Sequence, residues 1–258
     1  MSLLERSMQV AAPFGRYFET LMRVPRTLHE AGEVAASVAR SSEHVVLIPG
    51  YSSIRECMNP LKRTLEADGF AVHMARVPNN GLGDAREAAD LVAGMISGIR
   101  AADPTAGVHL VGHSRGGMIA RDVAVRYGAS QHIDSLIVLG SPQNGVRVTF
   151  PGIAKSRLMD PFIPESRLQL LAGSDYVQSL GSRALEQDGT HLASIYVDHF
   201  DGAVRPSEAH VAAAGWHNVA VPVGGPFPHL SMITNDRTTY RQLAAELATS
   251  IAGRTHAT

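Results

Sequence analysis

Cysteine is almost absent from this chain, because Cys57 is the only one among 258 residues. An intramolecular disulfide is therefore impossible, and a structural zinc site built on several thiolates is excluded. An excess of charge is missing too, since 23 Lys and Arg residues face 24 Asp and Glu residues, giving a net charge of −1. Such a balanced chain lacks the basic footprint of a nucleic-acid-binding protein, so we expect no nucleic-acid partner.

Long hydrophobic runs are missing as well. No segment approaches the ~18 uninterrupted apolar residues that a membrane-spanning helix requires. Near the N-terminus, Glu5 and Arg6 interrupt the first apolar residues before any stretch resembles the apolar region of a secretory signal. The sequence therefore predicts a cytoplasmic protein without a signal peptide or a transmembrane segment.

Cofactor and metal motifs are not found either. Glycines occur at 79–83, but they lack the spacing of a nucleotide-binding loop. His109 and His113 are four residues apart on a predicted strand, where the metal-binding geometry of helical i, i+4 histidines does not apply. We therefore predict neither a cofactor nor a metal ion.

Short apolar runs alternate with longer segments of helical periodicity. The apolar runs lie at 45–48, 71–77, 108–111, 136–139, 193–197 and 219–223. The helical segments lie at 54–67, 85–100, 115–127, 206–214 and 236–251. This alternation is typical of right-handed βαβ units, and runs that are apolar at every position are typical of strands covered on both faces. We predict a three-layer, doubly wound α/β domain over 41–258, with a mostly parallel sheet of about six strands.

Two regions depart from this alternation. Residues 1–40 carry apolar positions in a roughly helical rhythm, interrupted by Pro13 and Pro25, and predict N-terminal helices packed on the domain. An interfacial membrane anchor is the alternative interpretation, although the segment is not rich in lysine. Residues 143–190 form too long and too apolar a segment for a plain loop. Because functional loops gather at the carboxyl ends of parallel strands, we predict a cap-like insertion above the site.

The strongest motif is G-x-S-x-G at 112–116, which follows the apolar run at 108–111 and opens a helical segment. A nucleophile elbow needs a strand that ends abruptly, a strained residue at the bend, and glycines that let strand and helix approach closely. Ser114 is therefore the candidate nucleophile. The motif by itself is weak, and a glycine-rich turn with an incidental serine is the alternative.

A serine hydroxyl is a poor nucleophile, so it needs a base within hydrogen-bond reach and usually an acid that orients the base. Candidate acids follow the fifth predicted strand at Asp198 and Asp201, and His229 follows the sixth in a loop rich in Gly and Pro. Proximity alone does not separate the two acids. Three other histidines compete with His229 nearby: His199, His210 and His217.

With these motifs the chain resembles the α/β-hydrolase family, and within it the small bacterial lipases and esterases, over roughly 45–251. The segments that carry the resemblance are Pro-Gly-Tyr-Ser at 49–52, Gly-His-Ser-Arg-Gly at 112–116, Ser-Pro-Gln-Asn-Gly at 141–145, Asp-Gly-Ala-Val-Arg-Pro at 201–206 and His-Leu-Ser at 229–231. The resemblance implies Ser114 as nucleophile, Asp201 as orienting acid and His229 as general base. It also implies an oxyanion hole formed by the backbone N–H groups of Tyr51 and Arg115; the latter opens a helix, whose dipole favours negative charge.

These residues predict a serine hydrolase that cleaves carboxylic esters through an acyl-enzyme intermediate. The apolar insertion favours a small-molecule or lipid ester with an apolar acyl group. The same three residues suit esters, thioesters and amides alike, and a fold does not decide among them. Two alternatives stay open: an acyltransferase that uses the same triad, and a non-catalytic protein that binds an apolar ligand.

Overall fold

The computed structural model describes residues 42–50, 55–147, 165–182, 185 and 189–255. The predicted N-terminal helices at 1–40 lie outside these residues, as do Tyr51 and positions 148–164 of the predicted insertion.

Six parallel strands form one sheet in the order β2-β1-β3-β4-β5-β6. Their bounds are β1 (Glu43–Ile48), β2 (Ala71–Met74), β3 (Gly107–His113), β4 (Ser135–Leu139), β5 (His191–Val197) and β6 (Trp216–Val221). All six predicted strands are present, and the chain reverses its direction of winding between β2 and β3. Such a reversal is where open α/β sheets place their sites.

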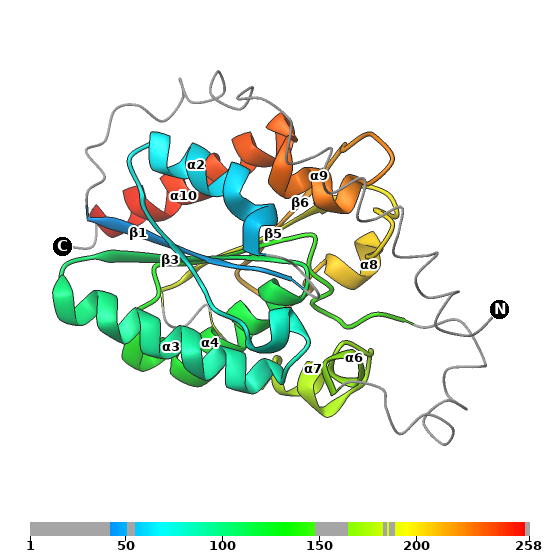
Figure 1. The fold of residues 1–258 in the computed structure, drawn as a ribbon, viewed down its shortest axis with the longest axis horizontal. Helices are drawn as coiled ribbons and strands as arrows, with labels where there is room; N and C mark the ends of the chain where they lie inside the picture. The colour runs from blue at the N-terminus through cyan, green and yellow to red at the C-terminus, as the bar shows by residue number, and fades with distance from the viewer. Residues whose placement is uncertain (1–41, 51–54, 148–164, 183–184, 186–188, 256–258) are drawn as a thin grey trace.

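Helices cover both faces of this sheet and make three layers (Figure 1). The helices are α2 (Asn59–Ala67), α3 (Ala85–Ala102), α4 (Arg115–Gln131), α6 (Glu165–Gln169), α7 (Asp175–Ser179), α8 (Pro206–Ala209), α9 (Pro228–Thr234) and α10 (Arg237–Thr255), with the 3-10 turns η2 (Arg55–Met58) and η3 (Pro78–Gly81). α3 and α4 lie on one face, and α2, α9 and α10 lie on the other. This arrangement is the α/β-hydrolase fold, as predicted. No helix among the described residues has the length and apolarity to cross a bilayer.

The alternation of side chains along the strands divides the core into two parts. Val46 and Leu110 pack with residues of α3 and α4, whereas Val45 and Val111 pack with residues of α9 and α10. Because every second side chain of β3 shares a face with Val111, the ends of this strand both direct histidines toward the α9 and α10 layer.

Several predicted boundaries are wrong. The fourth helical segment, predicted at 206–214, ends at Ala209. The last strand begins at Trp216 and ends at Val221, because Pro222 has no N–H to donate to the ladder. The second strand stops at Met74 rather than at residue 77.

Two further differences concern the helices that begin at the site. α4 continues past Gly128 to Gln131, and the left-handed residue that closes it is His132 with φ 46°. His229 does not lie in a loop, because Pro228 starts the helix α9 and His229 is its second residue. Proline is favoured at the first helical position, where a missing N–H costs nothing, so the same proline that suggested a loop begins a helix.

Candidate active site

Ser114 occupies the turn between the last residue of β3 and the first residue of α4. Its backbone has φ 54° and ψ −128°, a conformation that L-residues other than glycine rarely adopt. Ser114 N–H donates to the carbonyl of Leu139 at 2.9 Å, and Gly117 N–H donates to the carbonyl of Ser114 at 3.0 Å. The predicted strand, strained bend and helix are therefore present at Ser114.

The glycines around Ser114 are required by close backbone contacts. A Cβ on Gly112 would lie 2.5 Å from the carbonyl oxygen of Gly116. A Cβ on Gly116 would lie 2.1 Å from the carbonyl oxygen of Ile48, and one on Gly50 would lie 2.8 Å from the Cβ of Ser114. The strand β1 and the elbow thus approach each other at distances that only glycine permits.

His229 and Asp201 form a hydrogen-bonded pair. His229 Nδ1 lies 2.7 Å from Asp201 Oδ2, and His229 N–H donates to the carbonyl of Asp201 at 3.2 Å. The other carboxylate oxygen of Asp201 accepts the backbone N–H groups of Ala203 at 2.8 Å and Val204 at 2.6 Å. The carboxylate is therefore fixed in place, with one oxygen directed at the imidazole.

Asp201 stays ionised although its side chain is only 2% exposed. Burial by itself raises the pKa of this carboxyl, but the hydrogen bond and charge of His229 and the two backbone N–H groups hold the pKa below its ordinary value. An ionised Asp201 accepts a proton-bearing Nδ1, which leaves the Nε2 of a neutral His229 as the basic nitrogen.

The competing acid, Asp198, and the three competing histidines have other partners than Asp201 and His229. Asp198 contacts the neighbouring His199, with Oδ1 and Nδ1 2.6 Å apart, and both side chains are about half exposed. His210 hydrogen-bonds the hydroxyl of Tyr196, and His217 pairs with Glu246.

Gly140 and His113 connect the elbow at Ser114 to the His229–Asp201 pair. Gly140 follows the residue that accepts the Ser114 N–H, and a Cβ on it would lie 3.3 Å from His229 Nδ1 and 3.5 Å from Asp201 Oδ2. His113, the residue before Ser114, places its Nε2 2.9 Å from the carbonyl oxygen of His229. Among the described residues, Ser114 Oγ and His229 are not joined by a hydrogen bond. Catalytic hydrogen bonds commonly tighten only when substrate binds.

The first residue of α4, Arg115, contributes both a backbone N–H at the helix N-terminus and a buried side chain. Its guanidinium donates to the carbonyls of Gly81 at 2.7 Å and Gly83 at 2.6 Å, and to Gln169 Oε1 at 3.0 Å. Gln169 belongs to α6, so this side chain joins the elbow to the described part of the 143–190 segment. The other predicted oxyanion donor, Tyr51, lies outside the described residues.

The start of the 143–190 segment is joined to the loop that carries Asp201. Glu208 of α8 accepts the backbone N–H of Arg147 at 2.7 Å, and Asn144 Nδ2 donates to the carbonyl of His210 at 2.7 Å. The sequence did not indicate the contacts of His113, Arg115 or Glu208. Their partners are 116, 34 and 61 residues away along the chain, so no local pattern points to them.

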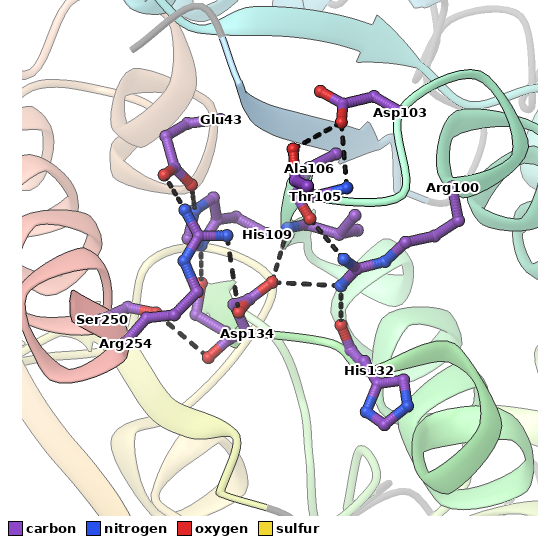
Figure 2. Close-up of polar contacts among 12 residues, drawn as sticks. Glu43, Arg100, Asp103, Thr105, Ala106, His109, His132, Asp134, Ser250 and Arg254 are labelled. Atoms are coloured by element: carbon purple, nitrogen blue, oxygen red, sulfur yellow. Dashed lines mark hydrogen bonds and ion pairs between the residues drawn. The ribbon is translucent and has the colours of Figure 1, made fainter. Parts of the chain in front are cut away.

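A second serine, histidine and carboxylate meet at the amino end of the same strand. His109 Nδ1 lies 2.8 Å from Ser135 Oγ, and His109 Nε2 lies 2.9 Å from Glu43 Oε2. Figure 2 shows Arg254 of α10 between Glu43 and Asp134, in contact with both.

No group of three or more His, Cys, Asp or Glu side chains in the described part of the chain could hold a metal ion.

The sequence of the chain matches a known protein family. The sequence pattern of the family described as palmitoyl protein thioesterase matches residues 44–188, which is more than half of the chain. The chain belongs to this family. Membership in the palmitoyl protein thioesterase family, on an α/β-hydrolase fold, supports an ester or thioester hydrolase. No curated protein sequence matches the chain.

Solved structures with the same fold include three lipolytic enzymes. The mature lipase BlEst2 of Bacillus licheniformis has 14% identity and a TM-score of 0.61, over 81% of this chain and 92% of that one. Lipase B of Aspergillus fumigatus has 18% identity and a TM-score of 0.59, over 77% of this chain and 47% of that one. The phospholipase PlaB of Legionella pneumophila has 14% identity and a TM-score of 0.61, over 80% of this chain and 60% of that one. The chain thus spans about half of the fungal lipase, and at these identities the likeness shows the fold alone.

Proposed function

We propose that the protein is a serine hydrolase that cleaves carboxylic esters and thioesters of apolar acyl groups, with Ser114 as nucleophile, His229 as general base and Asp201 as orienting acid. The observation that carries the proposal is the strained elbow at Ser114 beside a 2.7 Å pair of His229 Nδ1 and Asp201 Oδ2. A structural turn has no need of a positive φ at a serine, and backbone strain of this kind clusters at functional sites.

In the acylation step, Ser114 Oγ attacks the acyl carbon while its proton passes to His229 Nε2. The carbonyl π bond opens and its electron pair forms an oxyanion. The backbone N–H of Arg115, aided by the dipole of α4, stabilises this charge together with the backbone N–H of Tyr51. Collapse of the tetrahedral species breaks the bond to the alcohol or thiol, which leaves with the proton from His229.

In the deacylation step, His229 takes a proton from water as the water oxygen attacks the acyl-enzyme. The second tetrahedral species releases the carboxylic acid, and the proton returns from His229 to Ser114 Oγ. Asp201 stays ionised throughout, and it stabilises the imidazolium that forms in each half-reaction.

The acyl group is proposed to be apolar because 143–190 is rich in apolar residues. The described parts of this segment are anchored on both sides of the site, through Arg115 to the elbow and through Glu208 to the Asp201 loop. In this proposal the segment caps the site and binds the acyl chain. The thioester part rests on the family, whose name specifies palmitoyl thioesters. The carbonyl carbon of a thioester is attacked in the same geometry, so no further residue is needed.

The test is hydrolysis of p-nitrophenyl esters and acyl thioesters, from acetyl to palmitoyl, by the native protein and by Ser114→Ala. We expect the substitution to lower kcat by a factor of about 10⁴ or more on both series. Ser135→Ala is the matched control, since Ser135 also contacts a histidine but lies at the opposite end of the sheet, and it should retain native kcat. Full activity of Ser114→Ala, or inactivity of the native protein on both series, would refute the proposal. Ester formation with an added alcohol, in place of free acid, would identify an acyltransferase instead.

A further inference from the structure

His113 is the last residue of β3 and directly precedes Ser114. Its side chain is almost fully buried, at 1% exposure, and faces the α9 layer. There its Nε2 lies 2.9 Å from the carbonyl oxygen of His229, and the two imidazole rings are 4.6 Å apart with a tilt of 45°. A ring nitrogen can hydrogen-bond a carbonyl only as a donor, so Nε2 carries the proton.

The environment keeps His113 neutral. Burial, and then the charge of His229, lower the pKa of His113 to about 3, although its hydrogen bond to the His229 carbonyl acts in the opposite direction. With Nε2 protonated, Nδ1 is an acceptor, and it has no hydrogen-bond partner among the described residues. His113 is thus a fixed, uncharged donor in one tautomer and does not exchange protons in the working pH range.

We propose that His113 is a positioning residue, whose Nε2–H···O bond to the backbone of His229 sets the distance between the nucleophile elbow and the general base. This inference rests on the proposed roles of Ser114 and His229.

The physical argument comes from how His229 is anchored. Two of its hydrogen bonds, from its backbone N–H and from its Nδ1–H, connect it to Asp201. The bond from His113 connects it to the elbow, one residue from Ser114. The pair of His229 and Asp201 can move together while keeping their mutual bonds, but it cannot leave the elbow without breaking the bond from His113.

Such a change of distance is costly for catalysis, because a displacement of about 1 Å in a reacting group can reduce the rate about 100-fold. The loss should appear in kcat, since His113 is buried behind the reacting groups and is not placed to bind substrate. A residue that served stability alone would change the free energy of unfolding without this selective effect on kcat.

The kinetic test compares His113→Leu, which removes the donor at similar volume, with His113→Gln, whose side-chain amide reaches about as far as Nε2. We expect His113→Leu to lower kcat about 100-fold with KM within about twofold of native, and His113→Gln to recover kcat to within about fivefold. His113→Asn, whose amide is too short to reach the His229 carbonyl, should behave like the Leu variant and serves in its place if that variant does not fold. The control is His109→Gln, a buried histidine on the same face of β3, which should retain native kcat.

A second readout does not depend on turnover. A proton shared between His229 Nδ1 and Asp201 gives a far-downfield ¹H NMR resonance, which we expect in the native protein, His113→Gln and His109→Gln. In His113→Leu it should broaden or vanish because a mobile base exchanges this proton with water faster. The proposal is overturned if a folded His113→Leu or His113→Asn variant keeps kcat within twofold and the resonance intact. If the native protein cleaves no ester or thioester, the proposed function fails, and the resonance alone still decides whether His113 positions His229.

Discussion

The two ends of β3 carry the same three kinds of side chain. At the carboxyl end the residues are Ser114, His229 and Asp201; at the amino end they are Ser135, His109 and Glu43. The amino-end set has ideal hydrogen-bond lengths, 2.8 Å and 2.9 Å, yet both Ser135 and His109 have no exposed surface. Residue types and short distances are therefore not sufficient for a nucleophilic site.

The two serines differ in their backbone conformation. Ser135 begins the regular strand β4 and pairs in register with His109 on one side and His191 on the other. Ser114 has a positive φ, stands at the N-terminus of the 17-residue helix α4, and is partly exposed. In the proposed function a carbonyl substrate meets Ser114 beside the positive end of a helix dipole, whereas Ser135 has no exposed surface and begins a strand.

The carboxylates differ in their partners as well. Glu43 binds Arg254 of the C-terminal helix in addition to His109, so it fastens α10 to the edge of β1 and β3 (Figure 2). Asp201 receives backbone N–H groups from its own loop and directs its remaining oxygen at His229. The first arrangement joins elements together, and the second orients one imidazole.

Between the two carboxylates, the larger expected effect on catalysis is at Asp201. Asp201→Asn should lower kcat by a factor of about 10³ to 10⁴, because an amide favours the wrong tautomer of His229 and cannot stabilise its imidazolium. Asp198→Asn is the matched control three residues away, and Glu43→Gln is the control from the amino end; both should keep kcat near the native value on p-nitrophenyl esters. A larger loss at Asp198 than at Asp201 would show that the acid has been misassigned.

The next effect concerns stability. Here the larger loss is expected at the amino end of β3, where no loss of kcat is expected. Glu43→Gln should lower the free energy of unfolding by about 3 kcal/mol, because it leaves the partly buried Arg254 without its nearer charged partner, with Asp134 3.8 Å away. Glu66→Gln removes an ion pair to Lys62 on the surface of α2 and should cost less than about 1 kcal/mol. Urea unfolding followed by circular dichroism measures both. Equal, small changes would show that the amino-end network does not hold α10.

The smallest effect tests a third buried carboxylate, whose ion pair is longer than that of Asp201 with His229. Asp122 of α4 lies 3.6 Å from the nearest Arg126 nitrogen, and burial raises its pKa to about 6 despite the charges of Arg126 and Arg86. Between pH 4 and 6 the folded protein therefore binds more protons than the unfolded chain, so stability falls as pH rises through this window.

Asp122→Asn removes that dependence. The variant should be more stable than the native protein by about 2 kcal/mol at pH 7.5, and most of the gain should disappear near pH 4, where Asp122 is protonated in the folded protein and only partly ionised in the unfolded chain. Unfolding midpoints measured at the two pH values test the sign. A variant that is less stable at pH 7.5 would mean that the Arg126 pairing outweighs the burial of the charge.

The sequence predicted well what depends on local pattern. All six strands were found because each is a short apolar run between helical segments, and the elbow was found because glycines surround Ser114. The predicted ends of helices are less accurate, because a proline or a glycine can occur both in a loop and in a helix. Pro228, in a segment predicted as a loop, begins α9, and the helical segment predicted to end at residue 127 continues to Gln131.

The chemical character of the chain was determined by the sequence itself: a lone Cys57, a balanced charge, alternating strands and helices, and a serine between glycines. The tertiary structure alone decided which side chains meet. It brought His113 to the carbonyl of His229, 116 residues away, and it placed Asp201, the acid that the family resemblance implies, against the imidazole. Periodicity and turn chemistry act over a few residues and are visible in the chain, whereas the contacts between strand ends depend on how the whole sheet is packed.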